Sequence, residues 1–182
     1  MKHDSVPRPR ILRRFMGFFR PLLSSMLFSA VERADAKAAA KLLSLGANPN
    51  ARSESKAGFT PLTLNHTHSD ERCAAIGRSL LQAGADPNLP NRDGLTPLHY
   101  AAQFALPLLC SELLEAGANP DLANAKGLNP IESLRAFHGE TPSHYGLDHV
   151  AMIESLFERH ALAIASASKP DAFESRPRRQ RI

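Results

Sequence analysis

Apolar residues recur along the chain at helical spacing, in short segments that glycine and proline separate. In the clearest segment, Leu98 and Ala101 fall on one face of a first helix. Thr96-Pro97 starts this helix, because a threonine hydroxyl can cap free backbone N–H groups and proline suits the first helical position. Gly117 ends a second helix, where the chain must turn into a left-handed conformation. The pattern predicts a unit of helix, turn, helix and loop.

Two short motifs repeat along the chain and keep step with each other. Gly-Ala-Asn/Asp-Pro-Asn/Asp occurs at 46–50, 84–88 and 117–121. A second motif, glycine followed four positions later by leucine or isoleucine, occurs at 58–62, 94–98 and 127–131. The two motifs share a period of roughly 33 residues, which is typical of stacked repeats. One such unit cannot bury its apolar face alone, so the units are expected to stack.

The segment Thr96-Pro97-Leu98-His99-Tyr100-Ala101-Ala102 resembles the ankyrin repeat, a family with the same period. The resemblance implies an all-α repeat fold: an ankyrin-type α-solenoid of about four helix-turn-helix units joined by hairpin-like loops. It also implies that His99 hydrogen-bonds across neighbouring loops. The concave face of such a stack consists of the loop tips and the outer side of each first helix.

The remaining copies are more divergent, and they set the expected boundaries. We expect a basic N-terminal arm, four repeats and a basic disordered tail, at 1–21, 22–57, 58–93, 94–126, 127–162 and 163–182. The second repeat carries a short insertion near 66–72, and the fourth carries a longer one near 138–145. Asn65 and Gly77 stand where the family packs apolar or small residues, so we expect the second repeat to be the least stable.

Residues 11–27 separate apolar from polar positions unusually cleanly at helical periodicity. We expect Pro21 to split this stretch into a short helix near 11–20 and the first helix of the opening repeat. Three interpretations stay open: a helix that covers the end of the stack, a basic amphipathic helix on an anionic membrane, or a targeting segment. The membrane interpretation uses Arg13, Arg14, Phe15, Phe18, Phe19 and Arg20.

Charge is distributed unevenly over the 182 residues, whose net charge is +4. Residues 1–30 hold six basic residues and one acid, the tail from 166 holds five basic residues and two acids, and the body between them is acidic. The basic character therefore belongs to the two ends, which argues against nucleic acid as the partner. No apolar run is long enough to span a membrane, and there is no convincing secretory signal. We expect a cytoplasmic protein, either free or membrane-peripheral.

The residues offer little for catalysis or cofactor binding. Cys73 and Cys110 are too few for a zinc site and are expected to be small core residues. The eight histidines lack the spacing of a metal site, and no phosphate loop or nucleophile motif occurs. We expect no cofactor, no metal and no enzymatic activity. A regulatory subunit, a toxin-neutralising partner and a host-directed effector all remain compatible with the residues.

Binding of a protein partner is therefore the expected function. Equivalent positions of three repeats give an apolar strip edged by cations: Lys56, Phe59, Leu64, Arg92, Asp93, Leu95, Tyr100, Gln103, Lys126, Leu128 and Ser133. Such a groove suits a partner with apolar anchors and acidic neighbours. In the alternative interpretation, Phe59, Leu95 and Leu128 pack between the loops. We expect Tyr100→Ala with Arg92→Glu to weaken partner binding without unfolding the protein.

Overall fold

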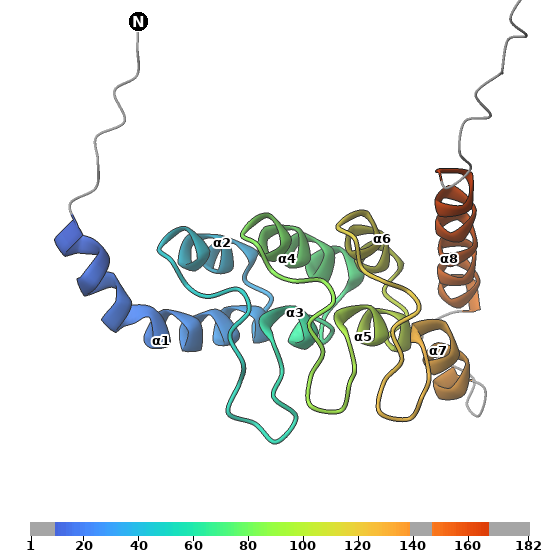
Figure 1. The fold of residues 1–182 in the computed structure, drawn as a ribbon, viewed down its shortest axis with the longest axis horizontal. Helices are drawn as coiled ribbons and strands as arrows, with labels where there is room; N and C mark the ends of the chain where they lie inside the picture. Colours follow the sequence, from blue (N-terminus) through green and yellow to red (C-terminus); the bar gives the residue numbers. More distant parts are fainter. Residues whose placement is uncertain (1–9, 139–146, 168–182) are drawn as a thin grey trace, which may run out of the picture.

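The computed structural model describes residues 10–138 and 147–167, and these residues form helices and loops without a strand. The helices are α1 (Arg10–Glu32), α2 (Ala36–Ser44), α3 (Pro61–Leu64), α4 (Asp70–Gln82), α5 (Pro97–Gln103), α6 (Pro107–Glu115), α7 (Pro130–His138) and α8 (Leu147–Ala167). They form four consecutive pairs in two layers, with α1, α3, α5 and α7 in one layer and α2, α4, α6 and α8 in the other (Figure 1). This arrangement confirms the predicted all-α repeat solenoid.

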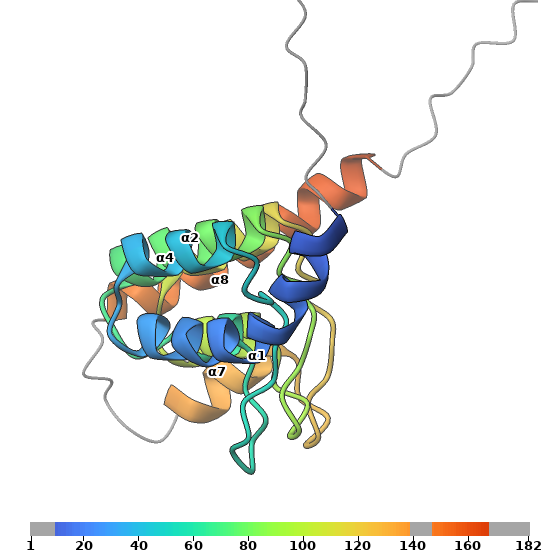
Figure 2. The ribbon, with the colours of Figure 1, turned by 90° about the vertical axis from the view of Figure 1, so that its left-hand side faces the viewer.

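The core lies between the two layers and repeats along the stack. Ile76 and Leu80 on α4 are fully buried, and Leu109 and Leu113 on α6, one repeat later, take the same places in the next unit. Cys73 and Cys110 are both buried among these apolar side chains, as expected. Seen along the stack, the layers lie one above the other and the long loops project together from one edge (Figure 2).

The predicted helix starts form as capping boxes. The hydroxyl of Thr96 accepts from the backbone N–H of His99, and the N–H of Thr96 donates to His99 Nδ1 at 3.2 Å. His99 Nε2 then donates to the carbonyl of Leu128 at 3.0 Å, in the following loop. The cross-loop bond that the family resemblance implied is therefore present.

The expected break at Pro21 is wrong, because α1 runs without interruption from Arg10 to Glu32. Proline lacks one N–H and crowds the preceding turn, and the helix responds by bending rather than ending (Figure 1). Ser24, one turn later, donates its hydroxyl to the carbonyl of Arg20 at 2.9 Å.

The expected start of the disordered tail at 163 is also wrong, because α8 continues to Ala167. His160 stands where the other repeats have the glycine that ends the second helix. Without this glycine, the alanine-rich stretch that follows stays helical. The rest of the predicted tail, 168–182, and nearly all of the predicted insertion at 138–145 lie outside the described residues.

Asn65 and Gly77, on which the expected weakness of the second repeat rests, both fit their surroundings, and the lower stability of this repeat stays a prediction. A Cβ on Gly77 would lie 2.6 Å from Leu109 Cδ1, so the glycine makes room for a core leucine of the next repeat. Asn65 is buried and donates its side-chain amide to the carbonyl of Cys73 at 2.6 Å. Gly77 thus serves the close packing of the second repeat on the third, and Asn65 links the end of α3 to α4 within the second repeat.

Candidate functional site

The long loops lie edge to edge and hold one another by backbone bonds. The N–H of Arg92 donates to the carbonyl of Ala57 at 2.8 Å, and the N–H of Ala125 donates to the carbonyl of Asp93 at 3.0 Å, at equivalent positions. Gly94, with φ at +77°, permits this approach, because a Cβ there would lie 2.8 Å from the nitrogen of Ala125. The loop tips therefore form one continuous edge along the stack.

Two asparagines shape the loops and fasten them to the helices behind. Asn91 Oδ1 accepts from the N–H groups of Asp93 and Leu95, and its amide donates to the hydroxyl of Tyr100 at 3.0 Å. Asn124 makes the corresponding bonds one repeat later, and its amide donates to Ser133 Oγ at 3.0 Å. Asn91 thus fixes the loop that carries Leu95, and Asn124 fixes the loop that carries Leu128.

The loops that precede α3, α5 and α7 are the first, second and third loops of the stack. A groove of about 480 Å³ opens between the second and third loops and the helices α5 and α7. Its lining comes from both loops and both helices: Asp93, Leu95, Gln103, Asn124, Ala125, Lys126, Leu128, Ser133, Ala136 and Phe137. Six of these residues belong to the predicted partner-binding set. The structure brings together Asp93, Leu95, Gln103, Lys126, Leu128 and Ser133.

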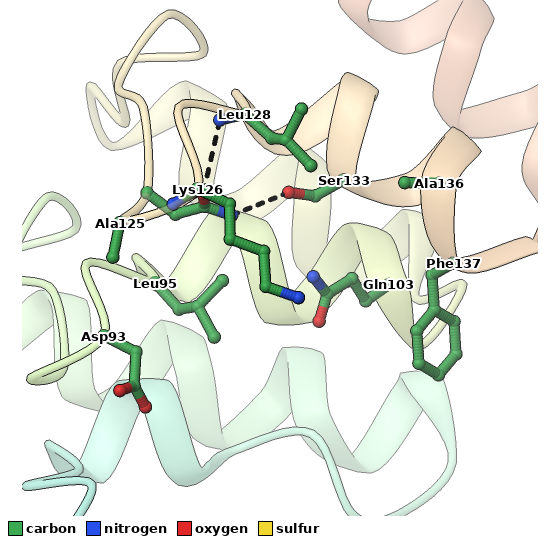
Figure 3. Close-up of a pocket in the computed structure, with 10 residues that line it drawn as sticks. Asp93, Leu95, Gln103, Ala125, Lys126, Leu128, Ser133, Ala136 and Phe137 are labelled. Atoms are coloured by element: carbon green, nitrogen blue, oxygen red, sulfur yellow. Dashed lines mark hydrogen bonds between the residues drawn. The ribbon is translucent and has the colours of Figure 1, made fainter.

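The groove combines an apolar surface with charges at its rim. Leu95 and Leu128 are half-buried, and Phe137 is 52% exposed at the far end of α7. Figure 3 shows the side chain of Lys126 extending over the groove between Leu95 and Gln103 in this view, with Asp93 on the opposite loop. Such a surface can hold an apolar side chain of a partner and leave its polar neighbours at the charged rim.

An aromatic row continues from the groove toward the first loop. Tyr100 stacks on His66 at 4.6 Å between ring centroids and lies 5.6 Å from Phe59. His66 also lies 4.5 Å from Phe104, which lies 6.2 Å from Phe137. Burial lowers the pKa of His66, although its Nδ1 bonds to the carbonyl of Thr63 and so opposes the shift. The neutral form of His66 is therefore favoured near pH 7.

Tyr100 and Ser133 are buried and offer a partner little surface. Tyr100 is 9% exposed beneath His66 and bonded to Asn91, and Ser133 is 2% exposed and bonded to Asn124. Burial and the charge of Asp93 raise the pKa of Tyr100 to about 12, so the hydroxyl stays protonated. Both residues support the loops from behind.

Arg92 is exposed but also belongs to the framework. Its guanidinium donates to the carbonyls of Ser55 and Lys56 at 3.3 and 3.1 Å, which ties the second loop to the first. Tyr100→Ala with Arg92→Glu would therefore remove two supports of the fold. That this pair leaves folding intact stays a prediction, and a sharper binding test uses residues outside the framework.

The other predicted residues lie outside the groove. Lys56 is exposed on the first loop, Phe59 is half-buried in the aromatic row, and Leu64 packs partly against the core. Of the residues named for a membrane contact, Phe19 is 52% exposed and Arg20 is exposed. Arg13, Arg14, Phe15 and Phe18 lie within α1, but their side chains are outside the described part of the structure.

Sequence reasoning missed Phe104 and Phe137, although a signal for them existed. They stand one repeat period apart, as do Asn91 and Asn124, which the prediction also omitted. Residues that recur at the repeat period share a place in the stack, so the period marks both pairs. His66 carries no such signal, because the extra residues of the second repeat begin there.

Histidines in and beside the predicted insertions contact backbone carbonyls. His68 Nε2 lies 2.7 Å from the carbonyl of Glu32, and His149 Nδ1 lies 3.2 Å from the carbonyl of Ala105. Within residues 10–138 and 147–167, no group of three or more histidine, cysteine or acidic residues is arranged to hold a metal ion. In the same part of the chain, no helix has both the length and the apolarity needed to cross a membrane.

Comparison with known families agrees with this geometry. The family model of ankyrin repeats, in three copies, matches residues 27–124, which is more than half of the chain. No curated protein matches the chain. The match runs from within α1 to the loop after α6 and includes four of the ten residues that line the groove.

Proposed function

Because the chain belongs to the ankyrin repeat family, whose repeats are generally protein–protein interaction modules and are typically non-catalytic, we propose that it binds a protein partner through the groove between α5 and α7. The observation that carries the proposal is the groove itself, with Leu95, Leu128 and Phe137 at its surface. An exposed aromatic beside half-buried leucines is the kind of surface that carries interface energy.

The charges around the groove favour a partner segment with acidic residues. The continuous edge of the loops exposes the cations Lys56, Arg92 and Lys126 and the acids Glu54 and Asp93. Lys126 borders the groove directly, so it is the cation most suited to a carboxylate beside an apolar anchor. The proposed partner presents one or two large apolar side chains with an acidic neighbour.

Affinity capture from the native lysate tests the proposal. Full-length protein and the variant Phe137→Ser with Lys126→Glu would be compared by quantitative mass spectrometry. Both side chains are exposed, so the variant should keep its thermal stability. We expect a partner of the wild type to bind the variant at least about tenfold more weakly, because an anchor contact and a charge pair are lost.

A matched control separates the groove from general surface effects. Leu45→Ser with Lys37→Glu likewise replaces an exposed apolar residue by serine and an exposed lysine by glutamate, on α2 and at its end, in the other layer. The control should retain the partner. Equal retention by the groove variant and the wild type would contradict the proposal, as would equal loss from both variants.

Nucleic-acid binding through the basic ends is the weaker alternative. It uses both basic ends, residues 1–30 and the tail from 166, and the arginines of 176–181 lie outside the described residues. It predicts binding that collapses between low and moderate salt.

A further inference from the structure

The apolar face of α1 is wider than the stack covers. Leu23 and Leu27 pack toward α2 and the core, and Leu27 is fully buried. Phe19, Leu22 and Met26 lie beside them on the surface of the helix and are 52%, 57% and 49% exposed. These three residues, spaced three and four apart, form a stripe along the helix that the repeats leave at the surface; we term it the α1 stripe.

The opposite end of the stack shows the usual way of finishing such a protein. Terminal repeats normally turn a polar face outward. On α7 and α8, Arg135 pairs with Glu154 at 3.0 Å, and Glu158 lies along the same cleft. α8 also exposes apolar residues, but it carries the acids Asp148, Glu154 and Glu158, whereas α1 has no acid before its last position.

The charge of α1 indicates what this stripe would meet. The helix contains Arg10, Arg13, Arg14 and Arg20, and its first acidic residue is Glu32, at its last position. Arg20 is exposed between the apolar positions Phe19 and Leu22. Exposed apolar residues on an arginine-rich helix match the two components of an anionic lipid surface, which are acyl chains and negative headgroups.

We propose that the α1 stripe, Phe19, Leu22 and Met26, lies against an anionic lipid bilayer while Arg20 contacts its headgroups. The bent first half of α1 projects away from the stack, and α5 and α7, which border the groove, lie toward the other end of the molecule (Figure 1). Contact with lipid therefore leaves the groove accessible. A second copy fits the stripe less well, because two arginine-rich helices would meet and like charges oppose the contact.

Vesicle sedimentation of the full-length protein tests this inference. Vesicles of phosphatidylcholine with about 30% phosphatidylserine should bind the protein, and vesicles of phosphatidylcholine alone should bind it far less. Phe19→Ser with Leu22→Ser and Met26→Ser should weaken binding at least about tenfold, because the apolar contact is removed. Arg20→Gln should weaken it about fivefold and reduce its dependence on salt.

The control removes as much apolar surface from another helix. Met152→Ser with Leu162→Ser and Ile164→Ser changes three exposed residues of α8, which are 48%, 70% and 51% exposed. This variant should bind vesicles as the wild type does, and thermal unfolding should show that both triple variants keep their fold. Equal binding by the α1 variant and the wild type would overturn the inference.

Two further results would also overturn it. One is equal binding of the wild type to both kinds of vesicle, which would remove the role of charge. The other is a dimer in analytical ultracentrifugation that the α1 variant dissociates, together with no vesicle binding, which would assign the stripe to a second copy.

Discussion

His99 connects two repeats through a single buried side chain. Its Nδ1 accepts from the N–H of Thr96, and its Nε2 donates to Leu128, so the ring bonds on both sides while neutral. Burial lowers the pKa of His99, against the opposing effect of the bond to Leu128. Protonation would place a second proton on Nδ1, where Thr96 already donates.

Stability should therefore fall in mild acid. The pKa values of His66 and His99 in the folded protein lie below 6.5, so the unfolded chain binds more protons between those values and 6.5. The contribution of the two histidines to the free energy of unfolding should be fully present above pH 6.5 and should be lost as the pH drops below it. Thermal unfolding at about pH 7.5 and about pH 5.5 measures this directly. An unchanged or higher melting temperature at the lower pH would contradict the assignment.

Gly77 gives the opposite result from the one that helix propensity suggests. Alanine normally stabilises a helix interior relative to glycine, but here its methyl group would meet Leu109 at 2.6 Å. Gly77→Ala should lower the free energy of unfolding by about 1–3 kcal/mol, as overpacking does. Denaturant unfolding measures the change. Leu109→Ala relieves the clash, so the double variant should lose less than the sum of the two single losses; simple additivity would refute the packing argument.

Single residues also show where prediction from sequence stops. Leu95 and Leu128 were predicted for the binding surface from their place after each loop glycine, and both line the groove. Tyr100 stands at an equally regular position but is buried, because His66 stacks on it. His66 comes from the irregular second repeat, and periodicity carries no information about side chains that an insertion brings in.

At the scale of helices, α6 begins with a cap supplied by another repeat. Leu106, at the N-cap position, makes no side-chain cap. Instead, Asp70 on α4 accepts from the N–H groups of Leu108 and Leu109 at 2.7 and 3.0 Å. Burial raises the pKa of Asp70, and these two bonds act against the rise. The carboxylate thus caps the N-terminus of α6 and links α4 to it.

Asp70→Ala should therefore destabilise the stack more than an ordinary surface change. Loss of the cap should lower the free energy of unfolding by about 1–2 kcal/mol, measured by denaturant titration. Glu71→Ala removes a neighbouring exposed acid from the same first turn of α4 and should have a much smaller effect. If the two variants lose equal stability, the loss reflects charge at the start of α4 and not the cap of α6.

The helices themselves were largely predictable, and the exceptions have physical causes. Thr-Pro starts and glycine ends recur with the period, so the inner and outer helices of the central repeats follow from local chemistry. The ends of the chain lack that repetition. There, Pro21 bends α1 without ending it, and the missing glycine at His160 lets α8 run on to Ala167.

The whole molecule presents two separate surfaces on one stack. The groove of α5 and α7 lies between loops that are fixed by Asn91 and Asn124, and the α1 stripe lies at the N-terminal end. The two proposals depend on different residues, so each can fail without the other. Together they describe a protein that binds a partner in its groove while α1 contacts lipid.

The central claim, binding through the groove, is tested most directly by site-specific photo-crosslinking in cells. A photoreactive phenylalanine would replace Phe137 in the groove or, in a parallel protein, Leu108, which is 43% exposed on α6 in the other layer. Both positions are exposed, so both proteins should fold. We expect a crosslinked adduct of defined mass from position 137 and none from position 108. Adducts from position 108 alone, or the same adducts from both positions, would contradict the claim.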